Sequence, residues 1–111
     1  MPLLNVTITR FIDQHQPGFV ECVLVDVRGR KWIFNEKIPI VSSEILDADS
    51  EYPRPGFIGC SIIRWQQNEG GRQSVVVNTE QPWHVESTDG NTVFEVFVEQ
   101  IEDVLAAQTP S

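Results

Sequence analysis

Two cysteines and two histidines are the residues of this 111-residue chain best suited to nucleophilic or metal chemistry. Cys22 and Cys60 each stand among apolar neighbours, with no cation nearby to stabilise a thiolate. Neither His15 nor His84 forms a close pair with another zinc ligand, such as C-x-x-C or H-x-x-x-H. The sequence therefore predicts two free, buried thiols, with one disulfide as the alternative, and no catalytic residue, metal or cofactor.

Both histidines lie in polar segments within two residues of a proline, which is typical of exposed loops. We therefore expect both to titrate near the ordinary imidazole pKa of about 6.5. A general base also needs a rigid support that holds it within hydrogen-bond reach of a substrate. For these reasons we expect that the protein is not an enzyme.

A long polar interval, residues 42–56, combines acids with an aromatic residue beside a proline. Its acids are Glu44, Asp47, Asp49 and Glu51, and its aromatic residue is Tyr52. The spacing of Asp47, Asp49 and Glu51 resembles the start of a calcium-binding loop. Tyr52, however, stands where that motif requires glycine, and Ile58 stands where it requires glutamate. We interpret the interval as a solvated acidic loop.

A second polar interval, residues 80–91, holds Trp83 and His84 directly after Pro82. A tryptophan in such a loop either folds back over the core or stays exposed as an anchor for a partner. If the two intervals emerge at the same end of the fold, they frame one surface with acidic walls and aromatic anchors. The predicted binding residues are Tyr52, Trp83, His84, Glu44, Asp47, Asp49 and Glu51.

Negative charge dominates the second part of the chain, and the whole chain has a net charge of −8. Residues 1–41 hold five Lys or Arg and four acids, whereas residues 42–111 hold three Arg and twelve acids. Nucleic acids and anionic membranes attract basic proteins, so neither is an expected partner. The charge either maintains solubility or steers a basic partner protein towards this one.

β-branched residues dominate the apolar composition, with 14 Val and 10 Ile against 5 Leu and 3 Ala. Such side chains pack better on a sheet than on a helix. Alternation and turn signals predict strands over residues 4–12, 19–27, 31–35, 57–66, 73–79 and 92–101. The sequence also predicts that residues 36–41 continue extended, with Pro39 at an edge or bulge, and that Ser42 or Ser43 caps one helical turn at residues 44–46.

We expect a single domain, residues 1–111, with an all-β fold. One flat sheet would leave an apolar face exposed, so about six mainly antiparallel strands should close into a small barrel or pack as a two-sheet sandwich. Ile101, Val104 and Leu105 are spaced i, i+3, i+4, which predicts one short helical turn near the C-terminus.

These observations favour a small, soluble, cytoplasmic binding protein, since neither a secretory signal nor an apolar run of about 18 residues is seen. The leading hypothesis is an acidic, non-catalytic interaction protein of an inhibitor or immunity type that covers a basic surface of another protein. Alternatives are a β-barrel that binds a small molecule or sugar, and a structural subunit that oligomerises through an exposed strand. Lys37 and Pro39 would blunt such an edge, so a monomer or weak homodimer is expected.

Overall fold

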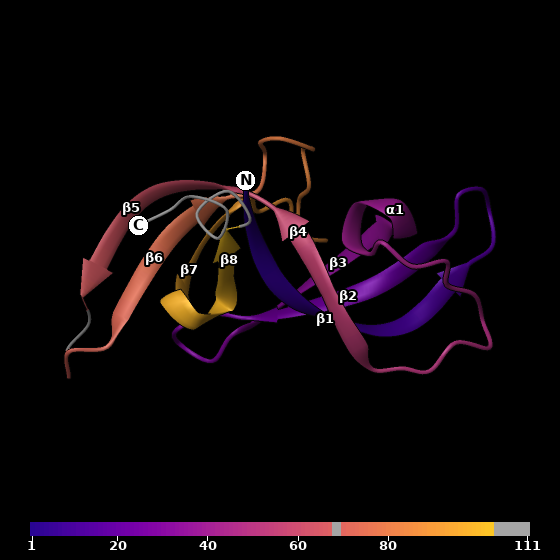
Figure 1. Ribbon diagram of the computed structural model, residues 1–111, viewed down its shortest axis with the longest axis horizontal. Coiled ribbons are helices and arrows are strands. Elements are labelled where there is room, and N and C mark those ends of the chain that lie inside the picture. Colours follow the sequence, from indigo (N-terminus) through magenta and orange to yellow (C-terminus); the bar gives the residue numbers. More distant parts are fainter. Residues whose placement is uncertain (68–69, 104–111) are drawn as a thin grey trace.

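The computed structural model describes residues 1–67 and 70–103 and arranges them in two antiparallel sheets (Figure 1). The first sheet has the order β3-β2-β1-β4, and β8 pairs with the start of β1. The second has the order β5-β6-β7. The strands are β1 (Pro2–Asp13), β2 (Phe19–Val25), β3 (Lys31–Lys37), β4 (Arg54–Gly59), β5 (Ser61–Gln67), β6 (Gln73–Asn78), β7 (Val93–Phe97) and β8 (Ile101–Asp103).

Side chains from both sheets fill the space between them. Leu4 and Phe34 of the first sheet and Val75 and Phe94 of the second are all buried in one core. The rings of Phe34 and Phe94 meet edge to face with their centroids 5.5 Å apart, an arrangement that aromatic quadrupoles favour. The all-β prediction is therefore confirmed in its two-sheet form, whereas a closed barrel does not form.

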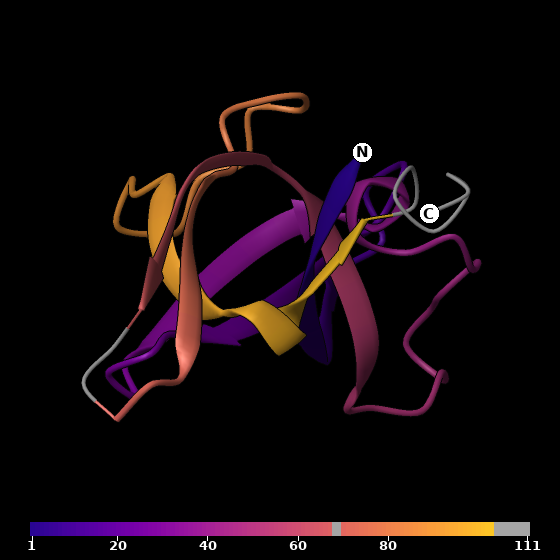
Figure 2. The ribbon, with the colours of Figure 1, turned by 60° about the vertical axis from the view of Figure 1, so that its left-hand side comes forward.

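Two of the predicted strands each divide into two, because the chain changes sheets within them. The first part of the predicted strand 57–66 is the end of β4. The chain then turns at Cys60, and the rest of the predicted strand is β5 in the other sheet. The backbone N–H of Cys60 donates to Pro2 O at 3.1 Å, which fixes this corner. The predicted strand 92–101 likewise crosses from β7 to β8 through a 3-10 turn, Val98–Gln100. Figure 2 shows both crossings as bends that connect the two sheets.

The alternation predicted for β1 holds in its first part and fails in its last. The predicted strand 4–12 places Leu4, Val6, Ile8 and Ile12 on one face. Leu4 and Ile8 are fully buried, as this alternation predicts, but Ile12 is exposed and Phe11 packs on the core instead. The pairing of β1 with β2 shifts register between Ile8 and Arg10 and again between Phe11 and Asp13. Such irregularities change which side chains face inward, because the side-chain period of a strand is two.

The helical turn predicted at residues 44–46 is wrong in position. The helix is α1 (Ile38–Val41), so the prediction that residues 36–41 stay extended is also wrong. Pro39 lies in the first turn of α1, where its missing N–H has no intrahelical partner to lose. Ser42 N donates to Ile38 O at 2.9 Å and ends the helix. No helix in the described parts of the chain has the length and apolar character to span a bilayer.

The predicted C-terminal helical turn exists, but it lies just before the expected residues. It is the 3-10 turn at Val98–Gln100, whereas Ile101 belongs to β8 and pairs with Leu4. The other two residues of the predicted turn, Val104 and Leu105, lie outside the described residues. Ile101 is in a strand rather than a helix because it pairs with β1, and a rule based on local spacing does not take such a distant partner into account.

Asp26 stabilises the turn of the β2–β3 hairpin from a buried position. Its Oδ1 accepts hydrogen bonds from the N–H groups of Arg28 and Arg30 at 2.9 and 3.0 Å, and its Oδ2 accepts one from Trp32 Nε1 at 2.9 Å. Burial raises the pKa of this carboxyl, but the hydrogen bonds from Trp32, Arg30 and Arg28 together lower it more. The folded state therefore favours the ionised carboxylate.

Replacing Asp26 by alanine should lower the free energy of unfolding by about 2–3 kcal/mol, because three donors lose a charged acceptor. The pKa of Asp26 is depressed in the folded state, so this contribution is present above the unfolded pKa of about 3.9 and is lost as pH falls through the folded value. Urea denaturation at neutral and acidic pH measures the effect. Asp49→Ala, at an exposed loop position, is the control, and an equal loss in both variants would contradict the role of Asp26.

Candidate functional site

The segment that follows β6 is fixed to the body of the protein at three points. Thr79 Oγ1 donates to Val85 O at 2.6 Å, and Val85 N donates back to Thr79 O at 3.0 Å. The side chain of Val85 is fully buried in the core. Further along, Thr88 N donates to Ile33 O of β3 at 2.8 Å. Residues 84–88 are therefore held against β3 rather than projecting freely.

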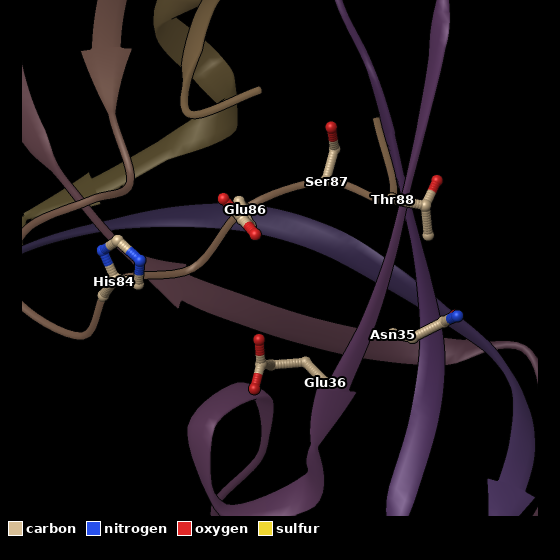
Figure 3. Close-up of a pocket in the computed structure, with 6 residues that line it drawn as sticks. All are labelled: Asn35, Glu36, His84, Glu86, Ser87 and Thr88. Atoms are coloured by element: carbon tan, nitrogen blue, oxygen red, sulfur yellow. The ribbon is translucent and has the colours of Figure 1, made fainter. Parts of the chain in front are cut away.

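A surface depression of about 360 Å³ lies between this segment and β3. We call it the acidic pocket, and six polar residues line it: Asn35, Glu36, His84, Glu86, Ser87 and Thr88 (Figure 3). Glu36 points from β3 towards the segment that carries Glu86, and the ring of His84 lies beside Glu86. The pocket is thus built from two parts of the chain that are about fifty residues apart.

The acidic pocket contains two carboxylates and no lysine or arginine among its lining residues. Within residues 1–67 and 70–103, neither Glu36 nor Glu86 forms an ion pair. Glu36 Oε1 accepts one hydrogen bond, from Lys37 N at 3.1 Å. Glu80 adds a third carboxylate nearby, with its Oε1 3.9 Å from His84 Nδ1. The arrangement creates a negative potential that a cation would relieve.

The negative charge of Glu36 also acts on the core beneath it. Burial first, and then the charges of Glu36 and Glu21, raise the pKa of Cys22 to about 12. Cys22 and Cys60 are both buried and neither forms a disulfide, so the prediction of two buried thiols is confirmed over the alternative of one disulfide. A thiol with so high a pKa carries almost no thiolate at neutral pH and is a poor nucleophile.

His84 adopts a left-handed backbone conformation, with φ of 53°, and its side chain is exposed beside the acidic pocket. The side chain of Trp83 does not line the acidic pocket, and its ring packs on Gly59. A Cβ atom at Gly59 would lie only 2.8 Å from Trp83 Cζ3, so the indole needs glycine there. The ring of Trp83 therefore folds back on the end of β4 and remains partly exposed.

The predicted residues of the first polar interval form local contacts among themselves. Tyr52 Oη donates to Asp47 O at 2.8 Å, and Asp47 Oδ1 accepts from Asp49 N at 2.8 Å. Glu44 pairs with Arg54, with the charged atoms 2.8 Å apart, and Glu51 is exposed. No cluster of three or more His, Cys, Asp or Glu residues suited to hold a metal occurs in the part of the chain that the structure describes.

The structure does not bring the two polar intervals together into one surface. Figures 1 and 2 both show the chain between α1 and β4 well apart from the chain between β6 and β7. His84 and Trp83 therefore belong to one region, and Tyr52, Glu44, Asp47, Asp49 and Glu51 belong to another. The second region is called the acidic loop here and covers residues 43–52.

Sequence reasoning missed two features of these regions. Glu36 and Asn35 line the acidic pocket, but their neighbours come from a distant segment, which no local pattern reveals. Ile45 is 99% exposed within the acidic loop, although it is strongly apolar. Its neighbour Leu46 is buried, so the Ile45–Leu46 pair was a usable signal that one of the two side chains must face outward.

His15 departs from the expectation that both histidines titrate normally. Its Nδ1 lies 2.7 Å from Asp13 Oδ1 in the turn between β1 and β2. The hydrogen bond with Asp13, and then the charge of that carboxylate, raise the pKa of His15 above its ordinary 6.5. Hydrogen bonds from the backbone and side chain of His15 lower the pKa of Asp13 in turn. The missed signal is the short Asp13-Gln14-His15 spacing within a turn.

An NMR titration should therefore find the pKa of His15 above 6.5, and Asp13→Asn should bring it back towards that value. The pair stabilises the fold only while both groups are charged. Its contribution is complete below the unfolded pKa of His15, about 6.5, and is lost as pH rises through the folded pKa. It is also lost in acid, as Asp13 becomes protonated. An unchanged pKa in Asp13→Asn would show that the contact is absent in solution.

Comparisons with protein families, with curated proteins and with solved structures gave no match. The functional argument therefore depends on the geometry and charge of the molecule itself. Of the two acidic regions, the acidic pocket has the more defined shape, because both of its walls are fixed by backbone hydrogen bonds.

Proposed function

We propose that this protein is a non-catalytic binding protein that covers a basic surface of a partner protein, in the manner of an inhibitor or immunity protein. The observation that carries the proposal is the acidic pocket, a depression of about 360 Å³ with two carboxylates and no lysine or arginine among its lining residues. A lysine or arginine side chain of the partner supplies the missing positive charge. The pocket then serves as the centre of the interface.

The chemistry of the lining residues suits an ammonium or guanidinium group. Glu36 and Glu86 offer charged acceptors, and charge-assisted hydrogen bonds are stronger than neutral ones. Asn35, Ser87 and Thr88 add neutral oxygen atoms for the remaining donors of the cation. A sugar site, by contrast, would favour an aromatic wall, and the six lining residues include none. These features support a basic protein partner over the small-molecule alternative.

The fixed position of residues 84–88 favours tight binding. Val85 is anchored in the core and Thr88 is bonded to β3, so the pocket exists before the partner arrives. A preorganised site avoids the entropy loss of ordering a loop on binding. The net charge of −8 adds long-range attraction, which raises the association rate of a basic partner at low salt. Two buried cysteines that form no disulfide are consistent with a reducing compartment such as the cytoplasm.

A defined probe tests the pocket. Titration of the ¹⁵N-labelled protein with arginine amide should shift the amide resonances of residues 35–36 and 84–88. Glu36→Gln/Glu86→Gln should abolish these shifts, because it removes both carboxylates of the pocket. Asp49→Asn/Glu51→Gln is the matched control: it changes the net charge equally but alters the acidic loop, and it should retain them. Equal responses of both variants would show that general acidity, not the pocket, attracts the probe.

The protein partner is then sought by capture from a cell extract at low ionic strength. The wild type and the acidic-loop variant should retain the same basic protein. The Glu36→Gln/Glu86→Gln variant should bind it at least about tenfold more weakly, since truncated charge pairs cost well over 1.4 kcal/mol at interfaces. Retention of only acidic or neutral proteins by the wild type would contradict the proposal.

A further inference from the structure

Strand β5 is the open edge of the second sheet. Its inner side pairs with β6 from Ser61 to Gln67. On its other side, no backbone hydrogen bond to another strand occurs within the described residues. Figure 1 shows β5 along the outer border of the molecule. A row of unpaired N–H and C=O groups at such an edge is a template for pairing with another strand.

Two of the four exposed residues of β5 are large and apolar, and the other two are Arg64 and Gln67. Ile63 is 47% exposed and Trp65 is 61% exposed. Arg64 is the only charged residue in β5 and β6 together, although the whole chain has a net charge of −8. Proteins that keep a strand edge free commonly place several charges or a proline on it, or distort it with a bulge. β5 has one arginine, no proline and one register shift, which is confined to its first part, between Ile62 and Arg64.

Three other edge strands, β3, β7 and β4, have contacts on their outer side, and a fourth, β8, is only three residues long and pairs, among the described strands, with β1 alone. At the edge strand β3, Ile33 O accepts from Thr88 N, and the strand begins and ends with lysines. At β7, Glu95 O accepts a hydrogen bond from Val27 N at 3.1 Å. At β4, the short helix α1 packs against the strand. β5 therefore differs from β3, β7 and β4, because no such contact lies on its outer side within the described residues.

We propose that β5 pairs with β5 of a second copy of this chain, which joins two three-stranded sheets into one six-stranded antiparallel sheet. The pairing of β5 with β6 is regular from Arg64 to Gln67, beyond a register shift between Ile62 and Arg64. An antiparallel register that sets Trp65 opposite Trp65 of the second copy also sets Arg64 opposite Gln66. This register pairs aromatic with aromatic and keeps the two arginines apart, as cross-strand stabilisation requires.

Charge makes β5 and β6 the face through which a second copy can approach. Two molecules of net charge −8 repel each other over most of their surfaces. They approach with least repulsion through β5 and β6, where the single charge is positive. A basic partner is attracted instead to the acidic pocket, and none of the six pocket residues belongs to β5 or β6. The dimer and the partner complex therefore use separate surfaces.

Sedimentation velocity from about 1 to about 100 µM tests the proposal across the range expected for a weak dimer. The wild type should change from monomer to dimer, and Trp65→Lys should remain a monomer. Ile33→Lys is the matched control, because Ile33 is also an exposed apolar residue on an edge strand; this variant should still dimerise. A wild type that stays monomeric throughout, or a Trp65→Lys variant that dimerises equally well, would overturn the proposal.

Hydrogen exchange on the wild type identifies the strand without relying on any variant. Amides of β5 that point away from β6 should exchange more slowly at high protein concentration, whereas amides of β3 should not change. A dimer without this protection would place the interface elsewhere and contradict β5 pairing. Protection that appears only after addition of an extended apolar peptide would identify a different occupant. The arginine amide titration of Trp65→Lys should match that of the wild type, which separates this test from the test of the acidic pocket.

Discussion

The pairing of β1 with three other strands is the constraint on which the rest of the fold depends. Over its first residues β1 lies between β4 and β8, and over its last residues it pairs with β2. Ile8, fully buried, marks the transition. It lies so close to β4 that a Cβ atom at Gly56 would be 2.7 Å from Ile8 Cγ1 and 3.0 Å from Val41 O. Glycine at this position therefore allows β1, β4 and α1 to meet.

From that arrangement follows the position of the acidic pocket. Pairing of β2 on β1 and of β3 on β2 sets the end of β3, where Glu36 lies. The second sheet delivers Glu86 to the same place, because the chain leaves β6 at Thr79 and is tied there to Val85. Both carboxylates remain in contact with water, so the folded state does not suffer the large cost of burying unpaired charges. A neutral partner that covered them would incur this cost, and a basic partner would not. In the proposed function, the pocket would thus discriminate between partners as well as attract one.

The sequence predicted the elements that local residue patterns specify. It did not predict the features that depend on contacts between residues far apart in the chain. Alternation and turn signals located the extended segments, because inward-facing Val and Ile recur at every second position, but they joined β4 to β5 and β7 to β8. They missed the division at Cys60, because the residues on both sides are apolar and the corner depends on a hydrogen bond to Pro2. They also missed α1, since Pro39 is compatible with an edge strand and with the first turn of a helix. For the candidate site, His84 was found from its loop, but Glu36 was not, because its neighbours are set by the tertiary fold.

The two proposed surfaces have a combined consequence. A symmetric dimer through β5 carries two acidic pockets related by a twofold axis. If a partner presents two basic sites at the matching separation, the second contact becomes intramolecular, and the apparent affinity rises without any new type of contact. If the partner presents one site, dimerisation leaves its affinity unchanged, because β5 and the pocket share no residue. The dependence of partner affinity on Trp65→Lys thus reports the valency of the partner, since this substitution removes the dimer contact and leaves Glu36 and Glu86 in place.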